Sequence, residues 1–257
     1  MIRVLHIIQQ LGPGRGGVRT FVSTMLDCPA PDIEQSVLSV GRVEGDRFGE
    51  RFFGPLIDSY SPLLVGTLGA KRLGAFLSKH RFDIVQIHTN NALGFVFASE
   101  AKKTGVPSRI VHCHNSALGS TSRLKNMVNV AMIERFLPSA SERWACSEVA
   151  GEYLFQGAGY ALVHNGVDSD KFRFSSSDRA AVRHRLGIPG DATVIGFVGA
   201  GIPAKNTLRA LDIFNQLRSS EADSCLLLFG QAEELPLAKE RAAELGAGRI
   251  GGFHRYC

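Results

Sequence analysis

The segment from Val4 to Leu26, VLHIIQQLGPGRGGVRTFVSTML, decides the fold. It begins with an apolar run of strand length, continues through a turn that contains four glycines, and ends with apolar residues at helical spacing. Glycines let the backbone approach a ligand closely, and the free N–H groups at the start of a helix favour an anion. The segment therefore predicts a βα unit with a phosphate-bearing ligand close to its turn.

The same alternation of short apolar runs and helical segments continues to His164, which predicts a parallel sheet covered by helices. We expect strands at Val4–Ile8, Gln35–Val40, Ile84–His88, Ser108–His112, Arg143–Cys146 and Ala161–His164. We expect helices at Val18–Leu26, Leu68–Lys79, Leu93–Lys103, Leu124–Phe136 and Glu148–Phe155. Together these elements predict one complete Rossmann-like domain over residues 1–170.

A polar segment interrupts this rhythm between Asp168 and Asp191, with a serine triplet at Ser175 to Ser177 before a short basic helix. Such a composition is typical of a domain boundary, and we assign residues 171–190 to a linker. The signals then return, with strands at Val194–Val198 and Cys225–Phe229 and helices at Asn206–Arg218 and Glu234–Leu245. Residues 191–257 are therefore predicted to form an incomplete second Rossmann-like domain.

The composition is that of a globular protein, because 44% of the 257 residues are hydrophobic and 21% are charged. No apolar stretch approaches the roughly 20 residues that span a bilayer. Five cysteines are scattered singly, which favours reduced thiols in a cytoplasmic protein. The net charge of +5 suits anionic partners such as phosphates, nucleotides or an anionic membrane surface, and does not choose among them.

The glycine turn contains Gly12, Gly14 and Gly17 in the G-x-G-x-x-G spacing of dinucleotide-binding proteins. Those proteins place an acidic residue at the end of the second strand, where this chain has Gly41 and Arg42. A Tyr-x-x-x-Lys pair for hydride transfer is also missing from the sequence. The pattern therefore disfavours an oxidoreductase and keeps the general expectation of a phosphate-bearing ligand.

Histidines stand at the ends of two further predicted strands. DIVQIHTNN places His88 at the end of one, and IVHCHNS places His112 and His114 at the end of the next. Ligands of open α/β sheets bind at the carboxyl ends of the strands, so His88 and His114 are expected to face one crevice. The alternative is that backbone hydrogen bonds satisfy these side chains and that they bind nothing. We expect no metal, because no carboxylate or further cysteine follows at a suitable spacing.

The order of motifs along nearly the whole chain resembles that of family 4 glycosyltransferases, the retaining GT-B enzymes that build bacterial capsular and extracellular polysaccharides. The matching segments are the turn with Gly16, Gly17 and Arg19, the strand Asp83–His88, His114 in HCHN, Ala145–Glu148, Asn165–Asp168 followed by Phe172, and Phe197–Asn206. The resemblance implies an α/β fold of the GT-B type, built from two Rossmann-like domains.

It also implies a hexosyltransferase that moves a sugar from a UDP-type nucleotide sugar to a growing, lipid-linked saccharide, with no metal or other cofactor and no nucleic acid partner. By resemblance, His114 is catalytic, and the residues that bind the substrates are Gly16, Gly17, Arg19, His88 and Asn165. Lys205 and Asn206 hold the donor diphosphate. Cationic and N–H donors at that point stabilise the negative charge that develops on the departing nucleoside diphosphate.

Two departures from the family pattern affect the donor side. Ala200 stands where the family has an arginine, which removes a bidentate phosphate donor. A pair of glutamates that the family has further along would fall beyond Cys257, so we expect a C-terminally truncated chain. The alternatives are a noncatalytic remnant that keeps an acceptor- or partner-binding domain, and a nucleotide-sugar epimerase or phosphorylase of the same fold.

The predicted helix Leu124–Phe136 is amphipathic. The residues on its apolar face are Leu124, Met127, Val128, Ala131, Met132 and Phe136. This pattern predicts a surface helix whose apolar face packs on the core. The alternative is contact with a membrane surface that delivers a lipid-linked acceptor, which would place the cytoplasmic protein at the inner face of the membrane.

Overall fold

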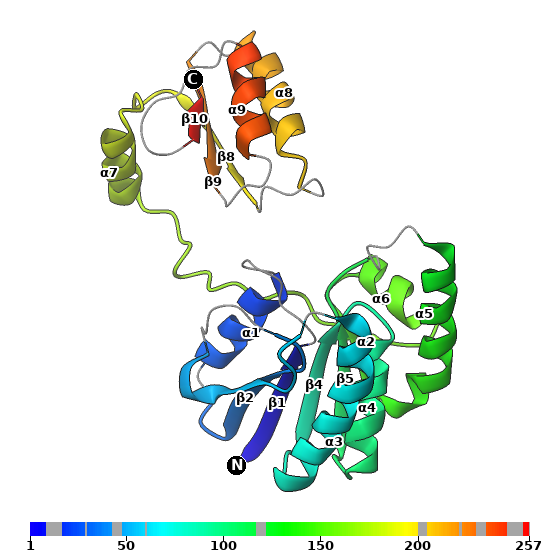
Figure 1. Ribbon diagram of the computed structural model, residues 1–257. Helices are drawn as coiled ribbons and strands as arrows, with labels where there is room; N and C mark the ends of the chain where they lie inside the picture. The colour runs from blue at the N-terminus through cyan, green and yellow to red at the C-terminus, as the bar shows by residue number, and fades with distance from the viewer. Residues whose placement is uncertain are drawn as a thin grey trace. The chain divides into compact units, whose positions relative to one another are not determined.

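The computed structural model describes residues 1–8, 17–28, 30–42, 48–59, 61–116, 122–199, 205–220, 223–229, 235–245 and 254–256. The chain divides into two compact units, Met1–Asp168 and Ser169–Cys257 (Figure 1). Each unit has a sheet and helices of its own.

Among the described residues of the first unit, seven strands form one parallel sheet in the order β3-β2-β1-β4-β5-β6-β7. Their bounds are β1 Ile2–Ile8, β2 Ile33–Ser39, β3 Phe52–Pro55, β4 Ile84–Thr89, β5 Ser108–Cys113, β6 Glu142–Ala145 and β7 Ala161–Leu162. The chain builds outward from β1 through β2 and β3, and then returns to the other side of β1 with β4. Open α/β sheets bind ligands at such a switch point, outside the carboxyl ends of the strands.

The helices of this unit cover the sheet (Figure 1). Their bounds are α1 Gly17–Asp27, α2 Pro62–Leu64, α3 Ala70–Lys79, α4 Leu93–Lys103, α5 Arg123–Phe136 and α6 Glu148–Phe155, with a π-helical turn η2 at Val65–Gly69 and 3-10 turns η1 at Gly49–Arg51 and η3 at Leu137–Ser139. The predicted α/β fold with a parallel sheet is confirmed. The strand β3 is an addition, because FFGP has no alternating pattern and its pairing with β2 decides its structure.

The two faces of this sheet differ in chemistry. One face is apolar and packs with α3 and α4 in a core that includes Leu5, Ile7, Leu73, Val85, Ile87, Phe95, Ala98 and Val111. Gly94 lets α4 approach the sheet, because a Cβ atom there would lie 2.3 Å from Thr89 Cγ2. The opposite face has the buried polar residues His6, Gln86, His88 and His112. Buried parallel strands are ordinarily apolar on both faces, so these polar residues call for a separate explanation.

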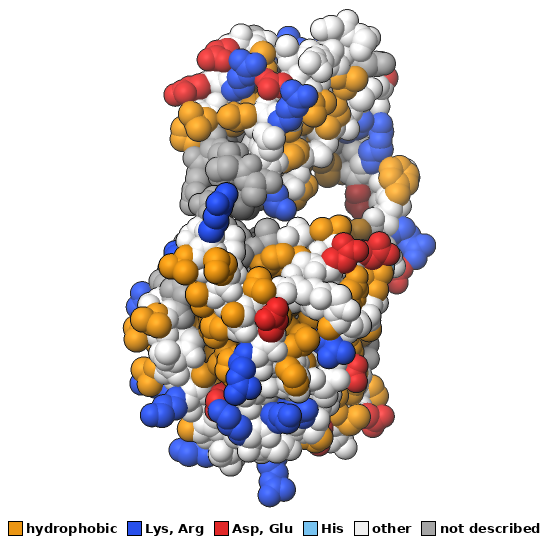
Figure 2. Space-filling view, turned by 90° about the vertical axis from the view of Figure 1, so that its right-hand side faces the viewer, with side chains coloured by type: hydrophobic (Ala, Val, Ile, Leu, Met, Phe, Trp, Pro, Cys, Tyr) orange, Lys and Arg blue, Asp and Glu red, His pale blue; other side chains and the backbone are white. Residues whose placement is uncertain are grey.

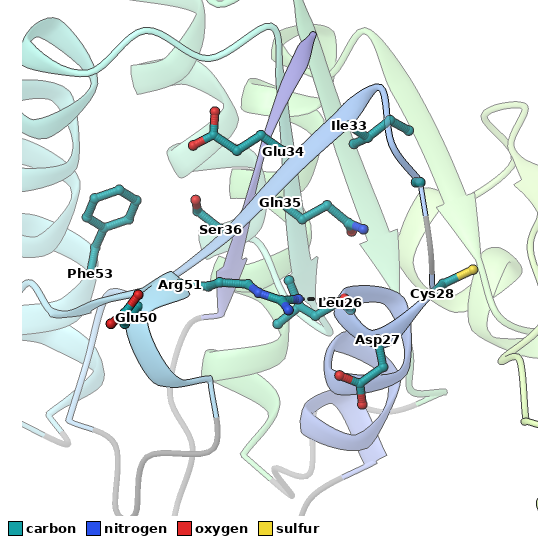
Figure 3. Close-up of a pocket in the computed structure, with 11 residues that line it drawn as sticks. Leu26, Asp27, Cys28, Ile33, Glu34, Gln35, Ser36, Glu50, Arg51 and Phe53 are labelled. Atoms are coloured by element: carbon teal, nitrogen blue, oxygen red, sulfur yellow. Dashed lines mark hydrogen bonds between the residues drawn. The ribbon is translucent and has the colours of Figure 1, made fainter.

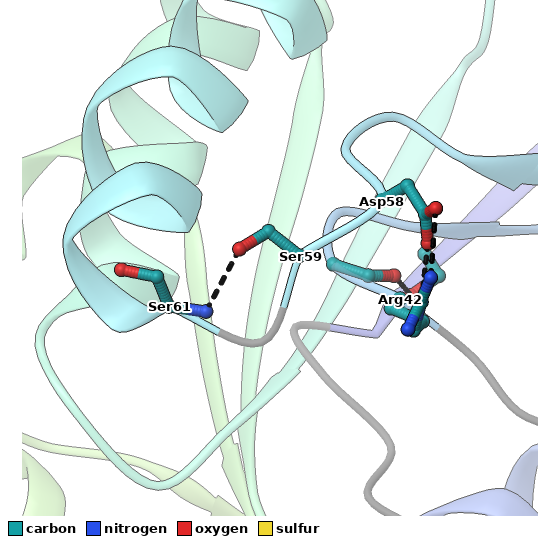
Figure 4. A network of polar contacts seen from close by, with 6 residues as sticks. Arg42, Asp58, Ser59 and Ser61 are labelled. Carbon is teal, nitrogen blue, oxygen red and sulfur yellow. Dashed lines mark hydrogen bonds and ion pairs between the residues drawn. The ribbon is translucent and has the colours of Figure 1, made fainter.

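A polar network holds the chain at the end of β2 (Figure 4). The Arg42 backbone N–H donates to the Ser59 carbonyl oxygen at 3.1 Å, and Arg42 Nη2 donates to Asp58 Oδ2 at 2.9 Å. Ser59 Oγ accepts from Ser61 N at 3.1 Å, directly before α2. Hydrogen bonding to the guanidinium lowers the pKa of the exposed Asp58 carboxyl. The network therefore ties the end of β2 to the start of α2.

The second unit is a smaller α/β structure. Its elements are α7 Ser176–Leu186, β8 Thr193–Val198, α8 Thr207–Arg218, β9 Ser224–Phe229, α9 Leu235–Glu244 and β10 His254–Tyr256. Among its described residues, β8 and β9 pair in parallel and β10 pairs with β9 in the antiparallel direction. Leu211 and Phe214 of α8 pack with Leu226 of β9 in the core of this unit. Ser175 caps α7, because its Oγ accepts from Asp178 N at 3.1 Å.

The cysteines are not all reduced. Cys28, Cys113 and Cys146 are free, whereas Cys225 on β9 is disulfide-bonded. The expectation of reduced thiols throughout is therefore wrong at Cys225. Spacing along the sequence does not reveal which thiols the fold brings together.

The apolar face of α5 is turned mostly to the surface. Leu124 is 70% exposed, Met127 68% and Val128 50%, whereas Ile133 is buried. Figure 2 views the first unit from the side of α5 and shows hydrophobic and basic side chains mixed on that surface. The expectation of a core-packed face is therefore wrong for the first turns of α5, because this helix packs beside α4 and η3. Among the described residues, we find no helix with the length and apolar character needed to cross a membrane.

Candidate functional site

Four histidines lie on the polar face of the first sheet, toward the carboxyl ends of its central strands. His6 is on β1, His88 on β4 and His112 on β5, and His114 follows directly after β5. His88 and His112 are direct neighbours in the register of β4 and β5, and His6 is paired with Gln86. Side chains alternate along a strand, so residues two positions apart share a face and the four imidazoles lie together.

A series of hydrogen bonds joins three of these rings. His114 Nε2 lies 2.9 Å from His88 Nδ1, and His88 Nε2 lies 3.1 Å from His6 Nδ1. His6 Nε2 lies 2.9 Å from Gln35 Oε1, and Gln35 Nε2 donates to the Met25 carbonyl oxygen at 2.9 Å. We call Gln35, His6, His88 and His114 the histidine series. Its members come from β2, β1, β4 and the end of β5, so only the assembled sheet creates it.

Phe21 of α1 packs against this cluster. Its ring centroid lies 4.9 Å from that of His114, 5.2 Å from that of His112 and 5.7 Å from that of His88. His112 stands outside the histidine series, and its Nδ1 lies 3.0 Å from Gln86 Nε2. Because Phe21 is only 6% exposed, its ring keeps water from one side of the cluster and strengthens the polar contacts there.

Burial keeps these histidines neutral. It lowers the pKa of His112 to about 3 and the pKa of His114 to about 4. Burial also holds the pKa of His88 well below the ordinary value of 6.5. It lowers the pKa of His6 from the same value. The neighbouring histidines lower the pKa of His88 further, because like charges repel. Around neutral pH the site therefore offers uncharged imidazoles, each with one N–H and one lone pair.

The structure brings Asn165 to the same place. Asn165 lies in the exposed segment after β7, and its side chain is close enough to His114 to raise the pKa of that ring against the larger effect of burial. His88, His114 and Asn165, which are far apart in the sequence, thus form one site at the carboxyl edge of the sheet. Their roles in binding and catalysis stay predictions.

Most of the glycine turn, with Gly12 and Gly14, lies outside the described residues. Gly16 lies outside the described residues, and Gly17 is the exposed first residue of α1. Arg19 is only 4% exposed, and its Cζ lies 5.8 Å from the centroid of the Phe48 ring. The burial of Arg19 gives it a packing role that its place in the motif did not indicate.

Lys205 and Asn206 lie in the second unit, at the start of α8. Lys205 is exposed, and its Cβ and Cγ lie 3.6 Å from the position that a Cβ atom on Gly199 would take. Asn206 has a left-handed backbone with φ of 53°, and its side chain makes no capping hydrogen bond. Lys205 thus lies near the end of β8 and the N-terminus of α8, where an anion is stabilised. Ala200 lies outside the described residues.

One ring nitrogen from each of His88, His112 and His114 lies within 4.8 Å of the others, which makes these residues candidate metal ligands. Zinc with imidazole ligands at about 2.0–2.1 Å holds the ligand nitrogens about 3.4 Å apart. His88 Nδ1 and His114 Nε2 are 2.9 Å apart, too close to have an ion between them. The arrangement therefore fits hydrogen-bonded imidazoles better than a metal centre.

A pocket of about 700 Å³ opens beside β2 and the end of α1 (Figure 3). Glu34, Gln35, Cys28 and Arg51 are among the residues that line it, and Arg51 Nη1 donates to the backbone carbonyl at the end of α1. The pocket lies beside the amino half of β2, whereas His114 follows the carboxyl end of β5. We therefore place the candidate site at the histidines and not in this pocket, although Gln35 belongs to both.

The expectations from the sequence left out four residues of the site. Alternation along VLHII and IVQIH puts His6 and Gln86 on the face of His88, so that signal was available. Phe21 and Gln35 had no such signal, because α1 and β2 meet the histidines only through packing.

Fold and site define an α/β protein of the Rossmann type whose polar site lies at the switch point of a parallel sheet. Residues 15–171, more than half of the chain, match the sequence profile of Glycosyltransferase Family 4. The chain belongs to this family.

Three known proteins are similar to it. EpsF of Bacillus subtilis, a protein named as a glycosyltransferase, is 26% identical over 249 residues, 89% of this chain and 62% of EpsF. UDP-Gal:alpha-D-GlcNAc-diphosphoundecaprenol alpha-1,3-galactosyltransferase of Escherichia coli is 24% identical over 190 residues, 71% of this chain and 49% of that protein. A solved glycosyltransferase structure from Rickettsia africae is similar over 95% of this chain and 65% of the Rickettsia chain. Its TM-score is 0.66 at 16% identity, which supports the fold. The chain spans less than two thirds of the length of each.

Proposed function

We propose that the protein transfers a hexosyl group from a UDP-type nucleotide sugar to a growing, lipid-linked surface saccharide, with retention and without a metal. The observation that carries the proposal is the grouping of His88, His114 and Asn165 at the carboxyl edge of the sheet, in a member of Glycosyltransferase Family 4. The name of the Escherichia coli relative states a UDP-Gal donor and a diphosphoundecaprenol-linked acceptor, which supports the substrate class.

The proposed roles follow from the chemistry of the residues. His114, neutral and half-buried, contacts the sugar at the reacting end, and His88 and Asn165 support it. Lys205 binds the donor diphosphate, since a cation at a helix N-terminus stabilises the charge on the leaving group.

Binding of UDP tests the donor side. We expect calorimetric titration of the chain with UDP to show binding that Lys205→Ala weakens about tenfold or more, since one charge-assisted hydrogen bond contributes about 1.5–3 kcal/mol. Lys239→Ala is the control, because Lys239 is exposed on α9 and its substitution removes the same charge from the same unit. Equal weakening by both variants would show a general charge effect and contradict the role of Lys205.

A transfer assay tests the activity. Incubation of the chain with UDP-hexoses and an undecaprenyl-diphosphate-linked GlcNAc should give a lengthened saccharide, and His114→Ala should abolish it. Acceptor binding without turnover would favour the noncatalytic alternative instead. Product formation that depends on inorganic phosphate or on a free sugar would favour a phosphorylase or an epimerase.

We further propose that α5 brings the protein to the inner face of the membrane, where a lipid-linked acceptor resides. Leu124, Met127 and Val128 follow the i, i+3, i+4 spacing of one helix face and are exposed, and Arg123 and Lys125 lie beside them. Helices with exposed apolar residues and flanking cations bind anionic lipid surfaces.

Sedimentation with vesicles of phosphatidylcholine and phosphatidylglycerol tests this contact. The double variant Leu124→Ser, Met127→Ser should lose the bound fraction, whereas Leu237→Ser on α9, which removes a side chain 54% exposed, should keep it. The binding should also weaken as salt is added. A bound fraction that the double variant leaves unchanged would contradict the proposal.

A further inference from the structure

The hydrogen bonds of the histidine series have a single direction, and a backbone carbonyl group sets it. The Met25 carbonyl oxygen can only accept, so the Gln35 atom 2.9 Å from it must be the amide nitrogen. The amide oxygen of Gln35 therefore faces His6 and can only accept as well. It follows that His6 Nε2 is protonated and donates to Gln35 Oε1.

The direction of one hydrogen bond fixes that of the next, because a neutral imidazole that donates through one nitrogen must accept through the other. With its proton on Nε2, His6 has its lone pair on Nδ1, so His88 Nε2 donates to it across 3.1 Å. His88 Nδ1 is then the acceptor for His114 Nε2, across 2.9 Å. His114 is left with a lone pair on Nδ1.

The neutrality of His88 is a condition for this order. A charged His88 would have two N–H groups, and His114 would then accept through Nε2 and hold its own proton on Nδ1. Burial opposes the charge, because it holds the pKa of His88 well below 6.5. Around neutral pH the direction set at Met25 therefore reaches His114.

His114 Nδ1 ends the series and is buried without a hydrogen-bond partner among the described residues. A buried acceptor without a partner is unfavourable, and a hydroxyl group that donates to it recovers the loss. Asn165 lies beside the same ring. A hydroxyl group both donates and accepts, so it suits a place where an imidazole lone pair and an amide meet.

We propose that Gln35, His6 and His88 are positioning residues that hold His114 as the tautomer with a lone pair on Nδ1, and that this nitrogen accepts a hydrogen bond from a hydroxyl group of the sugar substrate. The sugar contact rests on the proposed function, whereas the tautomer follows from the hydrogen bonds alone. The arrangement selects for a sugar with a free hydroxyl at this point, since a deoxy sugar would leave the buried lone pair without a donor.

Nuclear magnetic resonance of the full chain with ¹⁵N-labelled histidine tests the tautomer, because protonated and unprotonated ring nitrogens resonate far apart. At neutral pH we expect protonated Nε2 and unprotonated Nδ1 at all three histidines of the series. A proton on His114 Nδ1, or a doubly protonated ring, would overturn the proposal.

Variants test the positioning role. Gln35→Leu removes the acceptor for His6 and should give His114 a measurable fraction with the proton on Nδ1. Gln86→Leu is the matched control, because it breaks a hydrogen bond to His112 and leaves the series intact. If His114 has the same tautomer in Gln35→Leu as in the parent, or if Gln86→Leu disturbs it equally, Gln35 is not a positioning residue.

Adding zinc, EDTA or nucleotide sugars to the labelled protein distinguishes a metal site from a sugar contact. Zinc or EDTA should leave the ring nitrogens unchanged, and zinc-dependent shifts at His88, His112 and His114 would replace the hydrogen-bonded series with a metal site. UDP-glucose, UDP-galactose or UDP-GlcNAc should shift His114 Nδ1. No shift at His114 Nδ1 with a nucleotide sugar that calorimetry shows to bind would refute the sugar contact alone, whereas no binding of any of them would count against the proposed function. The tautomer would still stand or fall on the unliganded spectrum.

Discussion

Acid should destabilise the first unit, because its buried histidines are neutral in the folded state. The ordinary pKa of histidine is 6.5, whereas the folded pKa is about 3 for His112 and about 4 for His114. Below pH 6.5 the unfolded chain binds protons that the folded chain does not, so the free energy of unfolding falls as the pH falls. Above pH 6.5 both states have neutral rings, and the stability is fully present. The loss continues down to about pH 4 for His114 and about pH 3 for His112.

The magnitude follows from these values. At about pH 5.5 each of the two histidines lowers the free energy of unfolding by about 1.4 kcal/mol. The reason is that this pH is about one unit below the pKa of the ring in the unfolded chain, whereas the ring in the folded chain stays neutral. Together they remove about 3 kcal/mol, a large share of the roughly 5–15 kcal/mol that stabilises a typical domain. His6 and His88, whose pKa values burial also lowers, act in the same direction.

Urea unfolding at about pH 7.5 and about pH 5.5 measures this loss. Trp144 is the single tryptophan of the chain and lies 5.9 Å from His112 between ring centroids, so its fluorescence reports on this unit. His114→Gln should remove about 1.4 kcal/mol of the difference between the two pH values. His164→Gln is the control, because His164 is exposed in the same unit. Equal unfolding free energies of the parent protein at both pH values would refute the reasoning.

Three further substitutions follow from packing and capping. Gly94→Ala should lower the free energy of urea unfolding by about 1–3 kcal/mol, because the new Cβ would lie 2.3 Å from Thr89 Cγ2, and an unchanged value would contradict the close approach. Phe21→Ala should cost about 3–5 kcal/mol in the same assay, and should raise the pKa of His114 toward its ordinary value in a titration followed by nuclear magnetic resonance. Ser175→Ala should destabilise α7 by about 0.5–2 kcal/mol, seen as lower helix content on heating by circular dichroism.

Much of the site could be predicted because it follows local rules. His88 and His114 stand at the ends of strands whose apolar runs are plain in the sequence, and ligands of parallel sheets gather at those ends. The same period of two also places His6 on their face. The binding role of Arg19 stays a prediction, but its burial and its contact with the Phe48 ring could not be seen in the motif, because Phe48 belongs to a distant segment.

Other features needed the packed chain. Leu124 and Met127 follow the spacing of a core-facing helix, yet they are exposed, because the place of α5 beside α4 decides which side meets the core. Cys225 has nothing in its sequence surroundings that distinguishes it from the free cysteines. Both outcomes depend on contacts between segments that the sequence does not link.

The sequence by itself determined the βα rhythm, the parallel sheet and the strand ends at which the histidines lie, because backbone periodicity and glycine turns act over a few neighbouring residues. Only the tertiary structure decided that Gln35, His6, His88 and His114 form one hydrogen-bonded series. The proton position on His114 depends on the Met25 carbonyl group through atoms from five segments. Hydrogen bonds have a direction only once donor and acceptor are in contact, and that contact exists only in the folded sheet.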